Sequence, residues 1–179
     1  MMCVPLAMDA KNYLAVETTR ANRRVEIRSI KPEDRAALSA AVAQASDQSL
    51  YRRFFTVRRR FSERQVDFFV NVDFINHVAL VAIMEEDGKP AIVGGGRYVL
   101  IQPRKAELAF FVIDRYQGQG IGTLLMRHLI LIARNSGFQE LVAEVLSENR
   151  SMLGLFEKCG CQMTTTREGG VVHVALSVV

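Results

Sequence analysis

The chain has 179 residues, 49% of them hydrophobic, which is the size of one domain with enough apolar surface for a core that needs no disulfide or metal. Its net charge of +4 is modest, and polar or charged residues interrupt every apolar stretch well before the roughly 20 residues of a membrane-spanning helix. The first ten residues lack the leading positive charge of a secretory signal. We therefore expect a cytoplasmic protein that enters no membrane.

Cysteine and histidine residues give no sign of a metal site. The three cysteines are an odd number, and Cys159 and Cys161 are too close in sequence for a disulfide framework or a four-ligand zinc site. The three histidines are scattered along the chain. We predict free thiols and no metal.

Arginines are concentrated in one short stretch. Six of them fall within thirteen positions, at Arg52, Arg53, Arg58, Arg59, Arg60 and Arg64. Such a cluster is consistent with a solvated helix face, with steering of a phosphate-bearing cofactor or partner, or with nucleic-acid binding. The aromatic residues among them could stack on bases, but their helical spacing favours core packing. We predict no nucleic-acid partner.

Residues 1–23 lack clear periodicity, so we treat them as a leader that is either loose or adds an edge strand, and we place the folded domain at 24–179. In that domain, periodicity and turn chemistry predict elements of both kinds. In chain order they are a strand at 25–28, helices at about 33–45, at 46–55 and from 62, strands at 77–84, 91–100 and 106–113, a helix at 120–136, a strand at 140–146, a helix at 149–158, and a closing hairpin of 162–166 with 171–178. This order indicates a mixed α/β (α+β) domain.

The most informative segment is the junction between the strand at 106–113 and the helix that follows it, where Gly118, Gly120 and Gly122 alternate. A glycine-rich loop at a helix N-terminus binds anions, because its unpaired N–H groups and the positive end of the helix dipole face the ligand. A pyrophosphate is therefore the expected ligand. The alternative is a tight turn that only allows close helix packing.

The spacing of the glycines discriminates among pyrophosphate ligands. A P-loop requires a lysine after its last glycine, but Gly122 is followed by Thr123 and Leu124. A dinucleotide fingerprint requires its third glycine one residue later and a parallel strand unit, whereas the preceding strands are predicted to be antiparallel. Coenzyme A stays as the third candidate.

Gln117-x-x-Gly120-x-Gly122 resembles the signature of the GNAT superfamily of N-acetyltransferases. The stretch from Asn149 to Gly160 resembles the family's next segment, in which an asparagine opens a helix that ends in aromatic-x-Lys-x-Gly. The resemblance implies a GNAT fold, with a central, mostly antiparallel sheet of six to seven strands flanked by helices. It also implies that two central strands, 106–113 and 140–146, splay apart to admit the pantetheine arm of acetyl-CoA.

The resemblance also assigns the acetyl-CoA site residue by residue. Backbone amides of the loop would hold the pyrophosphate, the backbone at the end of the strand would pair with the pantetheine arm, and an asparagine side chain would bond to the cofactor. In that order the residues are Gln117, Gly118, Gln119, Gly120, Ile121, Gly122 and Thr123, then Val112 and Ile113, then Asn149.

Acetyl transfer requires an uncharged amine, so a base must take the proton from an acceptor whose reference pKa is about 10.4. Strand alternation places Glu107 on one face with Ala109, Phe111 and Ile113, where partial desolvation is expected to raise the carboxyl pKa. We predict that Glu107 is the base; the alternative is a solvated edge residue that pairs with Arg104 or Lys105.

The leaving thiolate is commonly reprotonated by a tyrosine in this superfamily, but the matching position here is Phe156, which has no proton to give. Tyr116, Ser151 or water would then supply the proton, or the thiolate would leave unassisted, since a thiol pKa is about 8.5.

Three stretches of this chain resemble the acetyltransferase domain of bacterial protein lysine acetyltransferases, in which the catalytic glutamate coincides with Glu107. They are 50–55, 72–81 and 106–110. The implied acceptor is a primary amine, either a protein lysine or a small molecule, and a homodimer stays open. A non-catalytic acyl-CoA-binding module is the alternative from another functional class.

Overall fold

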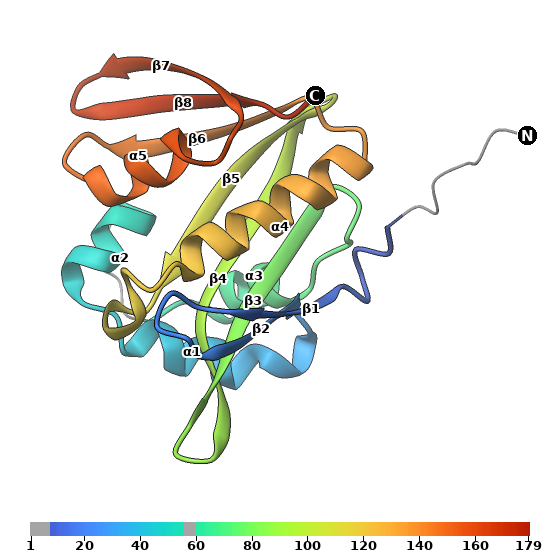
Figure 1. Ribbon diagram of the computed structural model, residues 1–179, viewed down its shortest axis with the longest axis vertical. Helices are drawn as coiled ribbons and strands as arrows, with labels where there is room; N and C mark the ends of the chain where they lie inside the picture. Colours follow the sequence, from blue (N-terminus) through green and yellow to red (C-terminus); the bar gives the residue numbers. More distant parts are fainter. Residues whose placement is uncertain (1–7, 56–59) are drawn as a thin grey trace, which may run out of the picture.

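The computed structural model of the protein describes residues 8–55 and 60–179. In these residues, the strands form a single sheet with the order β1-β2-β3-β4-β5-β6-β8-β7 (Figure 1). The strands are β1 (Leu14–Thr18), β2 (Arg24–Ser29), β3 (His77–Glu86), β4 (Lys89–Gln102), β5 (Lys105–Val112), β6 (Glu140–Leu146), β7 (Gln162–Glu168) and β8 (Val171–Ser177). Every neighbouring pair is antiparallel except β5 and β6. The mixed α/β class and the mostly antiparallel sheet are confirmed.

The sheet has eight strands in the described part of the chain, not the predicted six to seven, because residues of the leader form β1. β1 pairs with β2 from Leu14↔Arg28 to Thr18↔Arg24. Leu14 and Val16 are exposed on this edge strand, so it carries no strong alternation of buried apolar residues by which the sequence could have located it.

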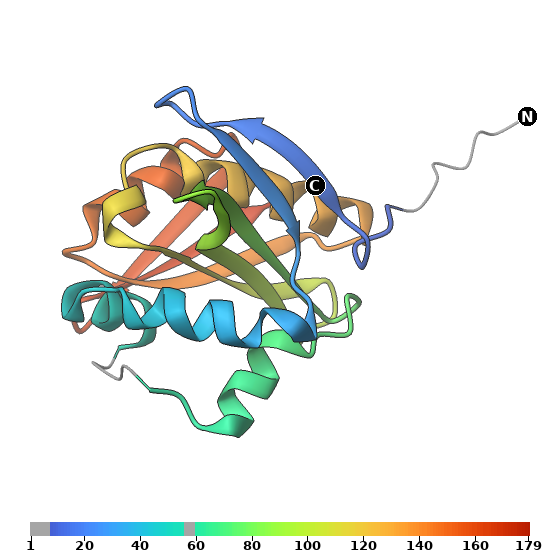
Figure 2. The ribbon, with the colours of Figure 1, turned by 90° about the horizontal axis from the view of Figure 1, so that it is seen from below.

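Helices cover both faces of the sheet (Figure 2). One face carries α1 (Arg35–Ala43), α2 (Asp47–Phe54) and α3 (Glu63–Val70), with a short 3-10 turn at Pro32–Asp34 before them. The other face carries α4 (Ile121–Asn135) and α5 (Arg150–Glu157). The Ser62 side chain accepts a hydrogen bond from Gln65 N, and the Gln65 side chain accepts one from Ser62 N, so a capping box begins α3.

The two central parallel strands separate along their length. β5 and β6 pair only from Lys105↔Glu140 to Glu107↔Val142, although β5 continues to Val112 and β6 to Leu146. The predicted splay is therefore present, and it opens toward the carboxyl ends of both strands.

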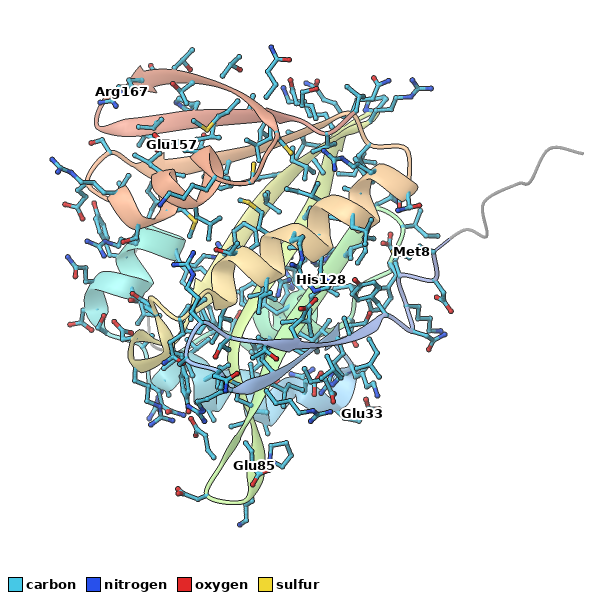
Figure 3. All side chains as sticks on the ribbon, in the orientation of Figure 1. Met8, Glu33, Glu85, His128, Glu157 and Arg167 are labelled. Carbon is cyan, nitrogen blue, oxygen red and sulfur yellow. The ribbon has the colours of Figure 1, made fainter. Side chains whose placement is uncertain are left out.

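The β1–β2 hairpin pairs with β3 through β2 and curves over α4 (Figures 1 and 2). His128, in the middle of α4, lies between this hairpin and the helix (Figure 3). Its Nδ1 contacts the Tyr13 hydroxyl, and its Nε2 lies 2.9 Å from a Glu17 carboxylate oxygen that also accepts a hydrogen bond from Arg127. This buried polar cluster fixes the hairpin on the helix.

The glycine run Gly94–Gly96 in β4 lies next to a β-bulge. The register with β3 changes from Ala82↔Gly94 to Ile83↔Ile92, so Val93 is the extra residue. A Cβ on Gly94 would lie 2.9 Å from the backbone oxygen of Phe111. The sequence therefore places glycine where β4 and β5 approach closely.

Candidate active site

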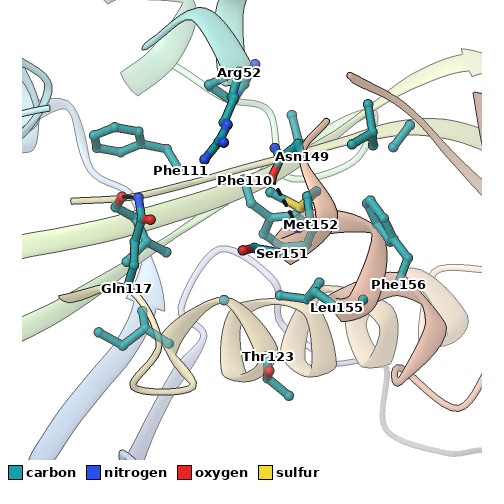
Figure 4. Close-up of a pocket in the computed structure, with 18 of the residues that line it drawn as sticks. Arg52, Phe110, Phe111, Gln117, Thr123, Asn149, Ser151, Met152, Leu155 and Phe156 are labelled. Atoms are coloured by element: carbon teal, nitrogen blue, oxygen red, sulfur yellow. Dashed lines mark hydrogen bonds between the residues drawn. The ribbon is translucent and has the colours of Figure 1, made fainter. Parts of the chain in front are cut away.

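A cavity of about 560 Å³ lies in the splay between β5 and β6. Its walls come from α2, the end of β5, the loop before α4, the first turn of α4, β6 and α5 (Figure 4). These segments lie far apart in the sequence, and the fold brings them to one cavity. Among its lining residues are eight of the predicted acetyl-CoA contacts, namely Val112, Gln117, Gly118, Gly120, Ile121, Gly122, Thr123 and Asn149.

The glycine loop has the conformation of an anion cradle. Gly118 and Gly120 have φ of +75° and +90°, and no side chain caps the N-terminus of α4, where Gly120 is the N-cap residue. The first-turn N–H groups of a helix have no partner within the helix, so here they are directed toward the cavity. These features fit the pyrophosphate of coenzyme A.

A polar network connects this loop to α2. The Asp114 carboxylate accepts hydrogen bonds from Ser46 Oγ at 2.6 Å and Ser49 Oγ at 2.9 Å, and the Gln117 side-chain amide donates to Ser49 Oγ at 3.1 Å and to Val112 O at 3.0 Å. Burial alone would raise the pKa of Asp114, but the hydrogen bonds from Ser46 and Ser49 lower it below its ordinary value. Asp114 therefore stays ionised and orders both segments.

The end of β5 offers backbone groups to the splay. Ile113 N–H donates to Val93 O at 2.9 Å, and by alternation the backbone groups of Val112 and Phe110 point the other way, toward β6. An extended ligand could pair with them as an added strand. Ile113 differs from its expected role, because its N–H bonds to β4 and its C=O accepts from Tyr116 N–H.

Gln119 and Asn149 take different positions. The Gln119 carbonyl accepts from Arg20 N–H and its side-chain amide donates to Arg115 O, so this residue lies outside the cavity lining. The Asn149 side-chain oxygen caps α5 by accepting from Met152 N–H at 3.3 Å (Figure 4). Its side-chain nitrogen is then the group that can donate to a ligand.

Glu107 lines the cavity from β5, opposite Val99 of β4, and its side chain is exposed. The expected enclosure by apolar neighbours is therefore absent in the chain alone. Lys105, one of its suggested partners, forms an ion pair with Glu140 at 2.6 Å instead. The charge of Glu107 instead acts on Arg53 of α2, which the sequence marks only as a member of the arginine cluster.

Arg53 is a half-buried cation. Burial lowers its pKa to about 10, an effect that the charge of Glu107 opposes. Its guanidinium lies over the Phe54 ring, 4.7 Å from the centroid. Arg53 and Glu107 together form the charged end of the cavity on the α2 side.

The candidates for thiolate protonation lie in different surroundings. Phe156 is 1% exposed and packs against Phe110, with ring centroids 6.3 Å apart. The Tyr116 hydroxyl donates a hydrogen bond to Glu86. Burial, and to a smaller extent this hydrogen bond, raises the pKa of Tyr116. Ser151 is exposed and points into the cavity (Figure 4). Ser151 is thus better placed than Tyr116.

His77 does not line the cavity. It is 8% exposed, its Nε2 lies 3.0 Å from Arg97 Nη1, and its ring lies against Phe68. Burial and the charge of Arg97 lower the pKa of His77 to about 4, so the ring is neutral at neutral pH. These contacts give it a packing role.

Metal-ligating side chains do not gather in groups of three or more within residues 8–55 and 60–179. In the same part of the chain, no helix is long and apolar enough to cross a membrane.

Comparison with known proteins identifies the family. The model of the acetyltransferase (GNAT) family matches residues 48–161, which contain the glycine loop, Glu107 and Asn149. The chain belongs to the GNAT family of acetyltransferases. The predicted family, fold, enzyme class and acetyl-CoA donor are thereby confirmed.

Several relatives of this GNAT protein are informative. An acetyltransferase of Pseudomonas aeruginosa is 33% identical over 141 residues, which is 78% of this chain and 76% of the relative. The acetyltransferase Pat of Mycolicibacterium smegmatis is 32% identical over 154 residues, 85% of this chain but only 45% of Pat. The crystal structure of the GNAT domain of S. lividans PAT matches with a TM-score of 0.83 and 31% identity, covering 92% of this chain and 96% of that domain.

Proposed function

We propose that this GNAT protein transfers the acetyl group of acetyl-CoA to the side-chain amine of a lysine in another protein. The observation that carries the proposal is one cavity that joins the glycine loop to Glu107 through the splay of β5 and β6. The likeness to Pat and to the PAT domain supports a protein lysine as the acceptor, one of the two kinds of acceptor that the sequence left open.

On this proposal, each end of the cavity has its own task. The N–H groups of Gly118 and of Gly120 to Thr123 hold the pyrophosphate, Val112 and Phe110 pair with the pantetheine arm, and the Asn149 amide donates to it. The acceptor lysine enters from the α2 side, where Glu107 lies beside Arg53.

The transfer then follows from the positions of these groups. Glu107 takes a proton from the lysine ammonium, directly or through water, and the free amine attacks the thioester carbonyl carbon. Backbone N–H groups of β5 that face the splay stabilise the negative oxygen of the tetrahedral intermediate. The C–S bond breaks as the amide forms, and the remaining proton of the attacking nitrogen passes to the leaving thiolate through water or the Ser151 hydroxyl.

The acceptor is tested by incubating the full chain and acetyl-CoA with two sets of amines. One set is the proteins of a cell lysate from which existing acetyl groups have been removed, and the other is a panel of amino acids, polyamines and aminoglycosides. The products of both sets are identified by mass spectrometry. We expect new acetyl-lysines that depend on Glu107. Acetylation of the small amines alone would replace the protein lysine with a small-molecule acceptor, and coenzyme A binding without any transfer would favour the non-catalytic module.

The cytoplasmic location, the absence of a nucleic-acid partner and the oligomeric state stay predictions. The arginine cluster bears on the predicted absence of a nucleic-acid partner. Residues 56–59 lie outside the described part of the chain, so the structure places only Arg52, Arg53, Arg60 and Arg64 of this cluster. Of these, Arg52 and Arg53 line the cavity, which supports the interpretation that the cluster serves a ligand.

A further inference from the structure

We infer that Arg20, from the N-terminal segment before the matched family region, is part of the donor site and binds the pyrophosphate of acetyl-CoA. The inference rests on the proposed donor site at the glycine loop. Arg20 lies in the turn between β1 and β2, 28 positions before the first residue that the family model matches.

The backbone joins this turn to the loop directly. The N–H of Arg20 donates to the carbonyl of Gln119 at 2.9 Å, so the two segments have a fixed relative position. Residue 20 and residue 119 belong to elements that are far apart in sequence, and the β1–β2 hairpin brings them together by curving over α4 (Figure 2).

The side chain of Arg20 also lies on the glycine at the helix start. A Cβ on Gly120 would be 3.3 Å from Arg20 Cγ and 3.5 Å from Arg20 Nε. The absence of a side chain at Gly120 thus leaves room for the stem of Arg20, and both residues line the cavity. The guanidinium is held at the N-terminus of α4, where the unpaired N–H groups are.

The charge of Arg20 is available to a ligand. Its side chain is exposed, and no carboxylate forms an ion pair with it among residues 8–55 and 60–179. A guanidinium matches two phosphate oxygens with parallel hydrogen bonds, and it acts on the same anion as the helix dipole. The guanidinium lies beside the loop whose backbone N–H groups are proposed to bind the pyrophosphate. The pyrophosphate is therefore the part of acetyl-CoA that Arg20 can reach.

The hairpin that carries Arg20 is itself anchored. Glu17 of β1 contacts His128 and Arg127 of α4, so the strand before the turn is fixed at a second point. The β1–β2 hairpin therefore contributes Arg20 to the wall of the donor site.

Binding of three probes to the full chain, measured by calorimetry, tests the assignment. The probes are coenzyme A, dephospho-coenzyme A, which lacks the 3′-phosphate, and pantetheine, which lacks all phosphates. The variants are Arg20→Met, which keeps the apolar stem against Gly120, Arg20→Lys, which keeps the charge, and Arg24→Met as a control. Arg24 is a neighbouring arginine whose side chain is 71% exposed and pairs with Glu26.

We expect Arg20→Met to weaken the binding of coenzyme A and of dephospho-coenzyme A by the same factor, about five- to tenfold, and to leave the binding of pantetheine unchanged. Arg20→Lys should recover part of the loss, and Arg24→Met should bind like the wild type. Equal binding of coenzyme A by wild type and Arg20→Met overturns the inference. A loss confined to coenzyme A also overturns it, because that result would place Arg20 at the 3′-phosphate. An equal loss for pantetheine does so too, because the role of Arg20 would then be structural. A wild-type chain that binds none of the probes would instead refute the donor site itself.

Discussion

The side-chain amide of Gln117 donates a hydrogen bond to the hydroxyl of Ser49 over 3.1 Å. One residue belongs to the GNAT signature and the other to α2, a helix on the opposite face of the sheet from α4. Ser49 also donates to Asp114, so its hydroxyl connects two points of the donor loop. The glycine loop is thus held by α2.

Ser49→Ala should weaken acetyl-CoA binding by about three- to tenfold while changing kcat little. Removal of the hydroxyl takes a hydrogen bond from both Gln117 and Asp114, which costs about 1 kcal/mol, and the loop must then be ordered by the ligand. Titration with coenzyme A and steady-state kinetics measure the two effects. Ser62→Ala removes a comparable hydroxyl, the cap of α3, and should lower stability without changing affinity.

Glu107→Gln should lower kcat for acetyl transfer by about 10²- to 10³-fold at neutral pH, because the amide cannot accept the acceptor's proton. Affinity for coenzyme A should stay within about twofold, since the carboxylate lies away from the glycine loop. The measurements are initial rates with a lysine peptide and calorimetry with coenzyme A. An unchanged rate on every accepted amine would show that another group is the base.

Gly94→Ala should destabilise the protein by about 2 kcal/mol, because the new methyl would lie 2.9 Å from Phe111 O and 3.3 Å from Val112 Cγ2. Gly154→Ala is the matched control. Gly154 lies within α5, where an added Cβ would have no neighbouring atom within 4 Å, so alanine there should stabilise the protein by up to about 1 kcal/mol. Urea unfolding of both variants compares the two shifts; a Gly94→Ala variant as stable as the wild type would show that β4 and β5 move apart easily.

The protein should lose stability on acidification from pH 6.5 toward pH 4, in part through His77. The pKa of His77 is about 4 when folded, against about 6.5 when unfolded, so in this window the unfolded chain binds a proton that the folded chain does not. The loss of unfolding free energy through His77 reaches about 2 kcal/mol by pH 5, because each pH unit between the two pKa values costs about 1.36 kcal/mol.

Unfolding free energies at pH 7.5 and 5 for wild type and His77→Gln measure this contribution. Glutamine keeps an acceptor for Arg97 and does not titrate, so the variant should lose less stability than the wild type over this range. His173→Gln changes a histidine whose side chain is 41% exposed and serves as the control. Identical pH dependence in wild type and His77→Gln would contradict the assignment.

The sequence by itself determined the donor loop and most of the sheet. Gly118 and Gly120 identify the loop because positive φ is a local requirement that glycine meets. Alternation along β5 likewise placed Glu107 on one face and the buried Phe110 on the other, because side chains of a strand alternate whatever the rest of the chain does.

Only the tertiary structure decided which distant residues complete the site. Arg20 reaches the loop through the curvature of the β1–β2 hairpin, and Arg53 joins Glu107 in the cavity lining through the packing of α2 on the sheet. Neither arginine has a local pattern that marks it. The sequence also could not show that Ile113 bonds to β4, since strand register depends on the bulge at Val93. Local patterns report backbone conformation and the side that is buried, whereas the partners of an exposed charge depend on how elements far apart in the chain pack together.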